Sequence, residues 1–299
     1  MTMRPRIALA TYEGAPDLAP DDQLLLASLV AAGADAEPAV WSSGEVIWET
    51  YDAVIIRSCW DYHRRAGEFR AWLDRLDASR IPTWNTPELV FWNSNKRYLL
   101  DLAARGVATI STVIVPQGCG ADVAAIVEAE GWARFVIKPA ISASGFETYA
   151  LAAPLDAASE QVVERVAALG DVLVQPFAEE VSRDGEGGGE LSFTFIDGAL
   201  SHATIKRAAP GEFRVQTEHG GRVDACAPSE ELAALAAQAA RVLTTLDEMP
   251  LYARVDGVAR GSAFLLMELE LIEPNLFLAY GDGAADRFAR AILGRIAQS

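Results

Sequence analysis

The sequence predicts an α/β protein that changes to an α+β arrangement in its C-terminal part. Residues 5–92 alternate short apolar runs with amphipathic stretches, the βαβ pattern of a Rossmann-like parallel sheet. From residue 190 onward, apolar runs are joined by short turns containing glycine, which is typical of antiparallel hairpins. The length of 299 residues fits two or three domains.

The first third of the chain contains the predicted parallel sheet. Strands are expected at residues 7–10, 39–41, 53–56 and 81–84, and helices at 21–32 and 68–78. The first helix should bury Leu24, Leu25, Leu29 and Val30, and the second should bury Phe69, Trp72, Leu73 and Leu76.

Ligands of open α/β sheets bind at the carboxyl ends of strands. The candidate substrate-binding residues at these ends are Tyr12, Arg57, Ser58, Asp61 and Tyr62. Arg57 is expected to clamp a carboxylate and Asp61 to hold an amine. Packing under a loop is an equally good interpretation of Trp60 and Tyr62. A dinucleotide is not indicated, because the sequence has no G-x-G-x-x-G motif.

The middle of the chain carries two lysines in positions suited to phosphate. Residues 87–93 are expected to be a linker, followed by a helix at 95–104 with Lys96 in its first turn, where the helix dipole disfavours a cation. Lys138 ends a predicted strand, and the small residues 142–145 follow it, so that backbone N–H groups could approach a phosphate. The other elements are expected at 112–115, 121–130, 146–150, 160–168 and 171–177.

The last third is predicted to contain two hairpins and two helices. The segment 184–189 (DGEGGG) is expected to be a mobile loop, and a hairpin at 190–206 turns at Asp197-Gly198. A helix at 229–246 should begin at the N-cap Ser229, and residues 282–296 form the closing helix.

A second hairpin, 251–258 with 263–272, is the centre of the prediction. A turn at 260–262 would place Arg254 opposite Glu268. The strand period then puts Arg254, Asp256, Glu268 and Glu270 on one face. The opposite, core-facing set is Val255, Leu265, Met267, Leu269 and Leu271. Carboxylates this close suit Mg²⁺ beside a polyphosphate, and the alternative is a solvated polar face of an edge hairpin.

Composition excludes some classes of protein. Lys and Arg number 25 against 42 Asp and Glu, a net charge of −17, so neither nucleic acid nor an anionic membrane is expected as a partner. The three cysteines lack C-x-x-C spacing, which favours reduced thiols. No run approaches the ~20 apolar residues of a membrane span. Because residues 7–10 are expected to form a strand and not a signal peptide, the prediction is a cytoplasmic protein.

These features, in this order, resemble the ATP-grasp superfamily of carboxylate–amine ligases. The resemblance covers essentially the whole chain and implies an ATP-grasp fold preceded by a Rossmann-like domain. It divides the chain into a substrate domain at 1–92, a small lobe at 93–177 and a C-terminal lobe at 178–299. It also implies ATP and Mg²⁺ as cofactors and a small amino-acid-like molecule as substrate, and it leaves open assembly into a homo-oligomer.

The resemblance assigns a role to each candidate residue. Those implied for ATP are Lys96, Lys138, Ser142, Ser144, Gly145, Gln175, Pro176, Phe177, Glu190 and Lys206. Those implied for Mg²⁺ are Asp256, Glu268 and Glu270. The residues implied for catalysis are Arg254, Lys206 and Arg214, and those implied for the substrate also include Arg214, Gly221 and Asn275. Lys206 would face the γ-phosphate, Glu190 would bind the ribose, and residues 175–177 would pair with adenine through the backbone.

The hairpin departs from the superfamily pattern at one position. The usual Glu-x-Asn is here Glu268-x-Glu270, followed by Asn275 a few residues later. Glu270 keeps an oxygen ligand but adds negative charge, and Asn275 is the alternative metal ligand.

Three runs resemble the ATP-grasp ligases that close D-cycloserine from O-ureido-D-serine: residues 57–62 (RSCWDY), 92–102 (WNSNKRYLLDL) and 268–277 (ELELIEPNLF). The alternatives are an intermolecular amide ligase of the glutathione-synthetase type, a small-molecule kinase, and an ATP-binding module without catalysis. His202 is favoured as a hydrogen-bonded sheet residue, whereas His219 could equally be a base near the substrate.

Overall fold

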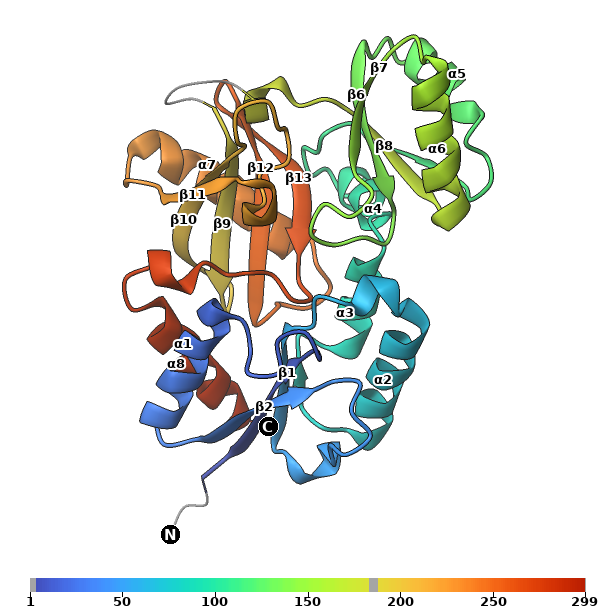
Figure 1. Ribbon diagram of the computed structural model, residues 1–299. Coiled ribbons are helices and arrows are strands. Elements are labelled where there is room, and N and C mark those ends of the chain that lie inside the picture. The colour runs from blue at the N-terminus through green and yellow to red at the C-terminus, as the bar shows by residue number, and fades with distance from the viewer. Residues whose placement is uncertain (1–3, 183–187, 299) are drawn as a thin grey trace.

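The computed structural model describes residues 4–182 and 188–298, which form three sheets (Figure 1). Most of the segment 184–189, expected to be a mobile loop, lies outside the described residues. The change from parallel to antiparallel pairing along the chain is confirmed, because the first sheet is parallel and the other two are antiparallel. The three-domain division itself stays a prediction.

The first sheet has the order β2-β1-β3-β4. Its strands are β1 (Arg6–Thr11), β2 (Asp35–Val40), β3 (Ala53–Ser58) and β4 (Thr83–Trp84). Its helices are α1 (Pro20–Ala31), α2 (Ala66–Ser79) and α3 (Pro87–Ser94). The last helix of the chain, α8 (Ala284–Ile296), returns to pack beside α1, while α2 covers the other face (Figure 1).

The second sheet has the order β5-β8-β6-β7 and is covered on one face by two helices. Its strands are β5 (Val113–Val115), β6 (Arg134–Pro139), β7 (Tyr149–Ala152) and β8 (Val172–Pro176). The helices are α5 (Asp122–Ala129) and α6 (Ala157–Leu169), and α4 (Tyr98–Ala104) precedes the sheet.

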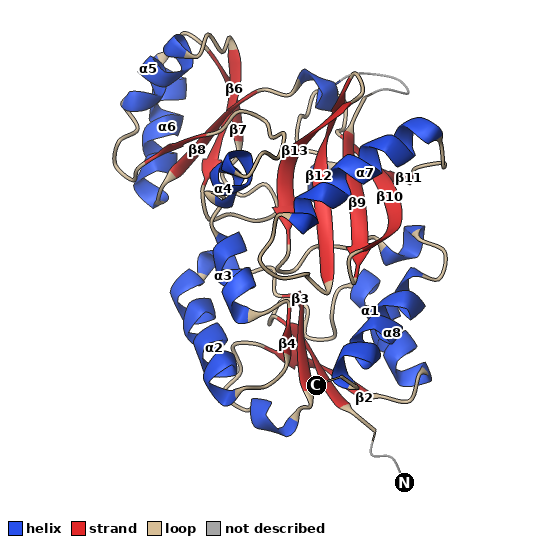
Figure 2. Ribbon diagram, turned by 180° about the vertical axis from the view of Figure 1, so that it is seen from behind, coloured by secondary structure: helices blue, strands red, loops and turns tan. Residues whose placement is uncertain are grey.

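The third sheet has the order β11-β10-β9-β12-β13. Its strands are β9 (Glu190–Ile196), β10 (Ala199–Arg207), β11 (Arg222–Ala225), β12 (Tyr252–Arg260) and β13 (Ala263–Glu270). Helix α7 (Glu230–Thr244) crosses its back (Figure 2). Short 3-10 turns occur at Trp48–Thr50, Tyr62–Arg64, Glu179–Ser182, Thr217–His219 and Leu278–Tyr280.

One face of the third sheet is apolar and the other is polar, because side chains alternate along each strand. Phe193, Val255 and Leu269 face α7 and α4 and are no more than 1% exposed. Ser229 begins α7 as predicted, because its side chain accepts a hydrogen bond from the N–H of Leu232, and such a cap stabilises a helix by about 1 kcal/mol. The polar face is therefore left free to build a site.

The register of the β12–β13 hairpin corrects the prediction. Arg254 pairs with Glu270 and Asp256 with Glu268, because the turn is shorter than expected and a bulge shifts the register after Asp256. The four charged side chains keep their common face. The bulge reverses the alternation beyond it, so Leu266 enters the core while Leu265 and Met267 do not join it.

Several smaller expectations were also wrong. Residues 87–93 form most of helix α3 and not a linker, and Lys96 lies in the turn between α3 and α4 instead of inside a helix. Leu24 and Val30 are exposed, so the buried stripe of α1 is narrower than predicted. Strand β11 was not anticipated. Among the described residues, no helix is long and apolar enough to cross a membrane.

Candidate active site

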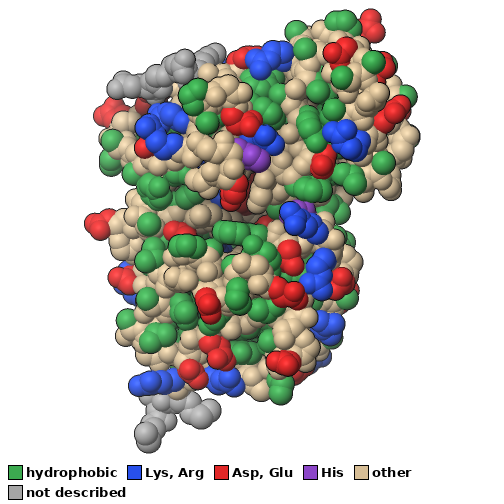
Figure 3. Space-filling model, viewed as in Figure 1, with side chains coloured by type: hydrophobic (Ala, Val, Ile, Leu, Met, Phe, Trp, Pro, Cys, Tyr) green, Lys and Arg blue, Asp and Glu red, His purple; other side chains and the backbone are tan. Residues whose placement is uncertain are grey.

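A pocket lies between the second and third sheets and reaches the carboxyl end of β3. In the space-filling view it opens as a hollow in the middle of the face, with acidic and basic side chains gathered around it (Figure 3). Most of the predicted site residues line this pocket: Tyr62, Lys96, Lys138, Ser142, Ser144, Gly145, Gln175, Pro176, Phe177, Glu190, Lys206, Arg214, Arg254, Asp256, Glu268, Glu270 and Asn275. Positions spread over more than two hundred residues of chain thus converge on one site.

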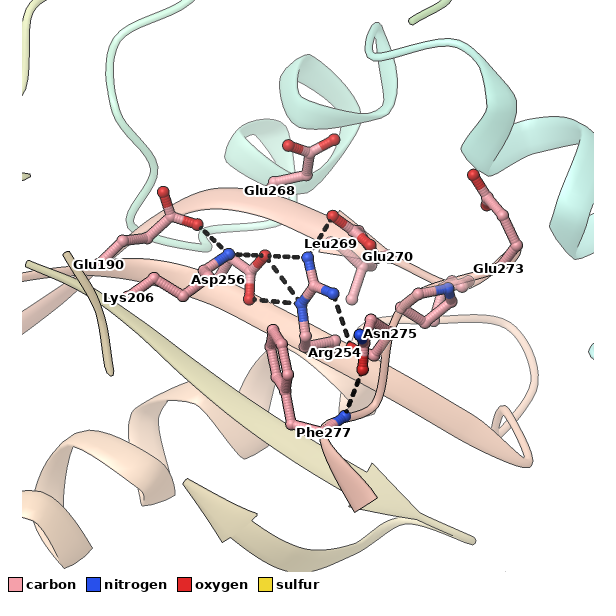
Figure 4. A network of polar contacts seen from close by, with 12 residues as sticks. Glu190, Lys206, Arg254, Asp256, Glu268, Leu269, Glu270, Glu273, Asn275 and Phe277 are labelled. Carbon is pink, nitrogen blue, oxygen red and sulfur yellow. Dashed lines mark hydrogen bonds and ion pairs between the residues drawn. The ribbon is translucent and has the colours of Figure 1, made fainter. Parts of the chain in front are cut away.

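The polar face of the third sheet forms the floor of the pocket. Asp256 accepts hydrogen bonds from Lys206 Nζ at 2.9 Å and from the guanidinium of Arg254 at 2.9–3.0 Å (Figure 4). Lys206 also pairs with Glu190 at 2.5 Å, and Arg254 pairs with Glu270 at 2.5 Å. Because Asp256 is only 1% exposed, the alternative of a solvated polar face is wrong.

Two lysines outside the third sheet reach this floor: Lys96, in the turn before α4, and Lys138, in β6. Glu268 accepts from Lys96 Nζ at 2.9 Å and lies 3.9 Å from Lys138 Nζ. Lys96 also donates to the carbonyl of Ser142, at the start of the small-residue loop, at 2.7 Å. Lys96 therefore ties the small-residue loop to the hairpin, which explains a buried cation in this turn.

The charges in the pocket shift one another's pKa values. Burial would raise the pKa of the Glu268 carboxyl, but Lys96 and Lys138 lower it to about 2. Burial and the neighbouring acids Glu268 and Asp256 raise the pKa of Glu270 to about 7, although Arg254 opposes this. Burial and then Lys96 lower the pKa of Lys138, with Glu268 opposing. The acids around Glu270 thus oppose its ionisation, whereas the lysines around Glu268 favour its ionised form.

The donor set fits a hard divalent cation. Among the residues that the structure describes, no three His, Cys, Asp or Glu side chains already converge on a metal position. The reason is visible in the ion pairs, since Asp256, Glu268 and Glu270 are each turned toward a lysine or arginine. A bound Mg²⁺ would favour the ionised form of Glu270, which the neighbouring acids oppose, and the three carboxylates remain the predicted ligands.

The predicted nucleotide-binding connector lies at the end of β8. Gln175, Pro176 and Phe177 line the pocket, but the N–H of Phe177 donates to the carbonyl of Arg134 at 3.0 Å. Any backbone pairing with adenine must therefore use other groups of this connector. The Gln175 side chain donates to Thr112 at 2.9 Å.

The small-residue loop lies against the segment that carries Arg214. Ser144 and Gly145 adopt φ values of 51° and 68°, and a Cβ on Gly145 would lie 3.5 Å from Arg214 Cδ. Arg214 is held by Glu212 at 2.7 Å and lines the pocket. Gly221 does not line the pocket. A Cβ there would meet the carbonyl of Val215 at 2.1 Å, so the role of this glycine is to allow a close backbone turn.

The predictions for Arg57, Ser58 and Asp61 as substrate residues are wrong. Arg57 is 0% exposed, with its Nε bonded to Asp22 at 2.8 Å and one Nη bonded to the carbonyl of Pro274. Ser58 donates to Asp22, and Asp61 accepts from the indole of Trp41 at 2.8 Å. These side chains build the frame of the site and do not line it.

Tyr12 does not line the pocket either; it lies beside Trp60, with ring centroids 6.4 Å apart. The predicted hydrogen-bonded state of His202 is confirmed, because its ring bonds Ser201 and the carbonyl of Leu276. His219 lies next to Gly145, and its role as a base stays a prediction.

The lining residues to which the sequence analysis assigned no role include Glu273 and Tyr98. Tyr98 accepts a hydrogen bond from the N–H of Leu269 and so fixes β13 to α4. The signal for Glu273 was its place three residues after Glu270, in a segment where the sequence suggested only Asn275, as an alternative metal ligand.

The pocket combines a carboxylate hairpin with two lysines and a small-residue loop. It lies between two antiparallel sheets and reaches the carboxyl end of a strand in the parallel sheet. This arrangement defines an ATP-grasp ligase. The comparisons agree: the fold matches a solved D-alanine–D-alanine ligase from Bacillus anthracis with a TM-score of 0.70 over 98% of both chains, at 14% identity. The predicted ATP-grasp fold is thereby confirmed.

More specific relatives place the chain within this class. It is 36% identical over 283 residues, 91% of its length and 92% of the relative's, to the cycloserine biosynthesis protein DcsG of Streptomyces lavendulae. The crystal structure of D-cycloserine synthetase DcsG matches with a TM-score of 0.84 and 32% identity, covering 97% of this chain and 99% of that one. Residues 7–85 match the family described as D-cycloserine synthetase DcsG, N-terminal domain. The chain belongs to the DcsG family of ATP-grasp ligases.

Proposed function

We propose that this enzyme uses ATP to activate the carboxylate of O-ureido-D-serine and closes it to D-cycloserine, with ADP and phosphate as the other products of ATP. The observation that carries the proposal is the convergence of Lys96, Lys138, Lys206 and Arg254 on the carboxylate face of one hairpin. Phosphoryl transfer needs cations placed where negative charge develops. The similarity to DcsG supports the choice of substrate.

The residues divide the work of the first step. Lys138 and Lys206 would hold the phosphates, and Arg254 would neutralise the acyl phosphate formed when the substrate carboxylate attacks the γ-phosphorus. Asp256, Glu268 and Glu270 would hold Mg²⁺, which, when bound, neutralises phosphate charge. Because the cations are already buried and fixed by partners, little reorganisation is needed at the moment of transfer.

The second step is a ring closure within one molecule. The oxyamine nitrogen attacks the acyl carbon and phosphate leaves, while hydrolysis of the carbamoyl group with water releases CO₂ and ammonia. The protein's task is to hold the substrate folded, since an oriented intramolecular attack gains several kcal/mol over an encounter in solution, roughly 7–11 at the upper end.

The experiment is turnover of O-ureido-D-serine with ATP and Mg²⁺, followed by measurement of ADP, free phosphate and product mass. D-cycloserine with equal amounts of ADP and phosphate is expected. A product joining two substrate molecules would indicate an intermolecular ligase. A stable phosphorylated product without free phosphate would indicate a kinase, and either result would refute the ring closure.

A further inference from the structure

Glu273 is an acidic side chain of the pocket that the reaction described above leaves unused. It follows β13 and lines the pocket, and its carboxyl group points to the same side of the sheet as that of Glu268 (Figure 4). The neighbouring acids Asp256, Glu268 and Glu270 each have a lysine or arginine partner. Among the described residues, the Glu273 carboxyl has no ion pair and accepts only from its own backbone N–H, so it can still accept from a ligand.

The backbone that carries Glu273 is held unusually firmly. Three consecutive carbonyls each accept from a different side chain: Trp60 donates to Glu273 at 3.0 Å, Arg57 to Pro274 at 2.5 Å, and Arg254 to Asn275 at 2.7 Å. Fixing three carbonyls in a row removes backbone freedom on both sides of the Glu273 side chain. A side chain aimed by such a frame is suited to binding and not to solvation.

The surroundings of Glu273 suit a positive group. Trp60, whose indole donates to the Glu273 carbonyl, and Tyr62 both line the pocket, and aromatic faces attract an ammonium group that has left water.

The geometry of an α-amino acid connects this place to the reacting carboxyl. Its ammonium nitrogen lies about 2.5 Å from the carboxyl carbon, so the two groups need neighbouring partners. Arg254, the partner proposed for the acyl phosphate, bonds the carbonyl of Asn275, and Glu273 is two residues earlier in the chain. The segment 273–275 thus carries an acid for the amine and, through its Asn275 carbonyl, holds Arg254, the cation for the carboxyl, on the neighbouring strand β12.

We propose that Glu273, walled by Trp60 and Tyr62, is the subsite that binds the α-ammonium group of the substrate and makes this ligase specific for amino acids. The assignment rests on the proposed function, because it places the reacting carboxyl at Arg254. It also replaces Asp61, which the sequence suggested for this role and which is bonded to Trp41.

The test compares O-ureido-D-serine with its analogue in which a hydroxyl replaces the α-amino group, by release of ADP. The wild type should favour the amine in kcat/KM by at least about 100-fold, as expected for a charge-assisted contact in a buried site. Glu273→Gln should raise the KM for the amine and reduce this preference about 10- to 100-fold, with the KM for ATP unchanged. Glu273→Asp should keep the preference, and the exposed Glu164→Gln is the matched control.

The outcomes separate the two proposals. If the wild type turns over the substrate and the amine preference survives in Glu273→Gln, the subsite alone is overturned. A raised Mg²⁺ requirement with the preference intact would do the same, since Glu273 would then serve the metal. If Glu273→Gln does not fold, Glu273→Ala takes its place, and an amine preference that survives in that variant would overturn the subsite. If the wild type neither turns over O-ureido-D-serine nor binds D-cycloserine in calorimetry, the proposed function is overturned, and the subsite with it.

Discussion

Replacing Arg57 by methionine should destabilise the enzyme and not simply weaken substrate binding. Methionine fills a similar volume but removes every donor of the guanidinium. It would leave the carboxylate of Asp22, which is 3% exposed, without its cation at 2.8 Å. The guanidinium also lies 4.8 Å from the centre of the Tyr252 ring, a contact that methionine keeps only as apolar packing.

The size of the effect follows from the burial of both partners. Breaking a buried ion pair by removing one member costs about 3–5 kcal/mol, because an uncompensated charge stays in the interior. An unfolding entropy of about 2.1 cal/mol/K per residue over 299 residues gives about 0.6 kcal/mol/K. The melting midpoint of Arg57→Met should therefore fall by about 5–8 °C if the chain unfolds as one unit.

The assay is thermal unfolding of the full chain by calorimetry, with two companions. Arg222→Met removes an exposed pair, 71% and 38% exposed on its two sides, and should change stability by no more than about 1 kcal/mol. Adding Asp22→Asn to Arg57→Met removes the stranded charge and should recover about 1–3 kcal/mol.

One result would refute this reasoning. If Arg57→Met melted within about a degree of the wild type and its KM for the substrate rose more than about 30-fold, Arg57 would be a ligand of the substrate, as the sequence suggested. Recovery of stability in the double variant would instead support the structural role of Arg57. If Arg57 only contacted the substrate, replacing Asp22 would not restore stability.

Three further changes probe the pocket. Lys138→Met should lower kcat/KM about 100- to 1,000-fold in an ADP-release assay, because it removes a buried cation from the transferring phosphate; a rate within about 3-fold of the wild type would contradict its role. Trp60→Phe keeps the ring but loses the donor to the Glu273 carbonyl, so the substrate KM should rise about 3- to 10-fold at constant kcat, and a change confined to the KM for ATP would argue against it. The pKa of Glu273 is raised to about 8 by burial and then by Glu270, so the folded state favours the neutral carboxyl. The contribution of this group to folding stability is therefore complete below the ordinary carboxyl pKa and is lost as pH rises through about 8. Denaturant unfolding at pH 5 and pH 8 should show Glu273→Gln gaining about 1–3 kcal/mol relative to the wild type at the higher pH, and no difference between the two pH values would contradict the shift.

The sequence predicted the charged face of the hairpin because strand alternation is a local rule. Arg254, Asp256, Glu268 and Glu270 share a face whatever the exact register, provided that both strands stay extended through them. The bulge near Met267 was not predictable in this way, since one extra residue leaves no mark on composition or period. The bulge therefore made the prediction wrong only for the core-facing side chains beyond it.

Arg57 shows where sequence reasoning fails for a physical reason. Its position at the end of a parallel strand is where ligand-binding residues gather, and that rule is sound for the fold. Its partners, however, lie 35 and 217 residues away in the chain, at Asp22 and the carbonyl of Pro274. No local pattern distinguishes an arginine that meets a substrate from one that meets a distant carboxylate. Glu273 is the converse case, since its importance comes from lacking such a partner among the described residues.

The ion pairs of the pocket also explain how a chain with a net charge of −17 can receive a polyanion. Fields from surface carboxylates are screened over about 8 Å at physiological salt, so the charges that decide binding are those inside the pocket. There, the lysines are held by acids: Lys206 by Asp256 and Glu190, and Lys96 by Glu268. A nucleotide with its metal could exchange partners within this set, phosphate oxygens taking the lysines while the metal takes the carboxylates. Such an exchange leaves no buried charge unpaired. This matters because a buried charge without a partner strongly destabilises the folded state.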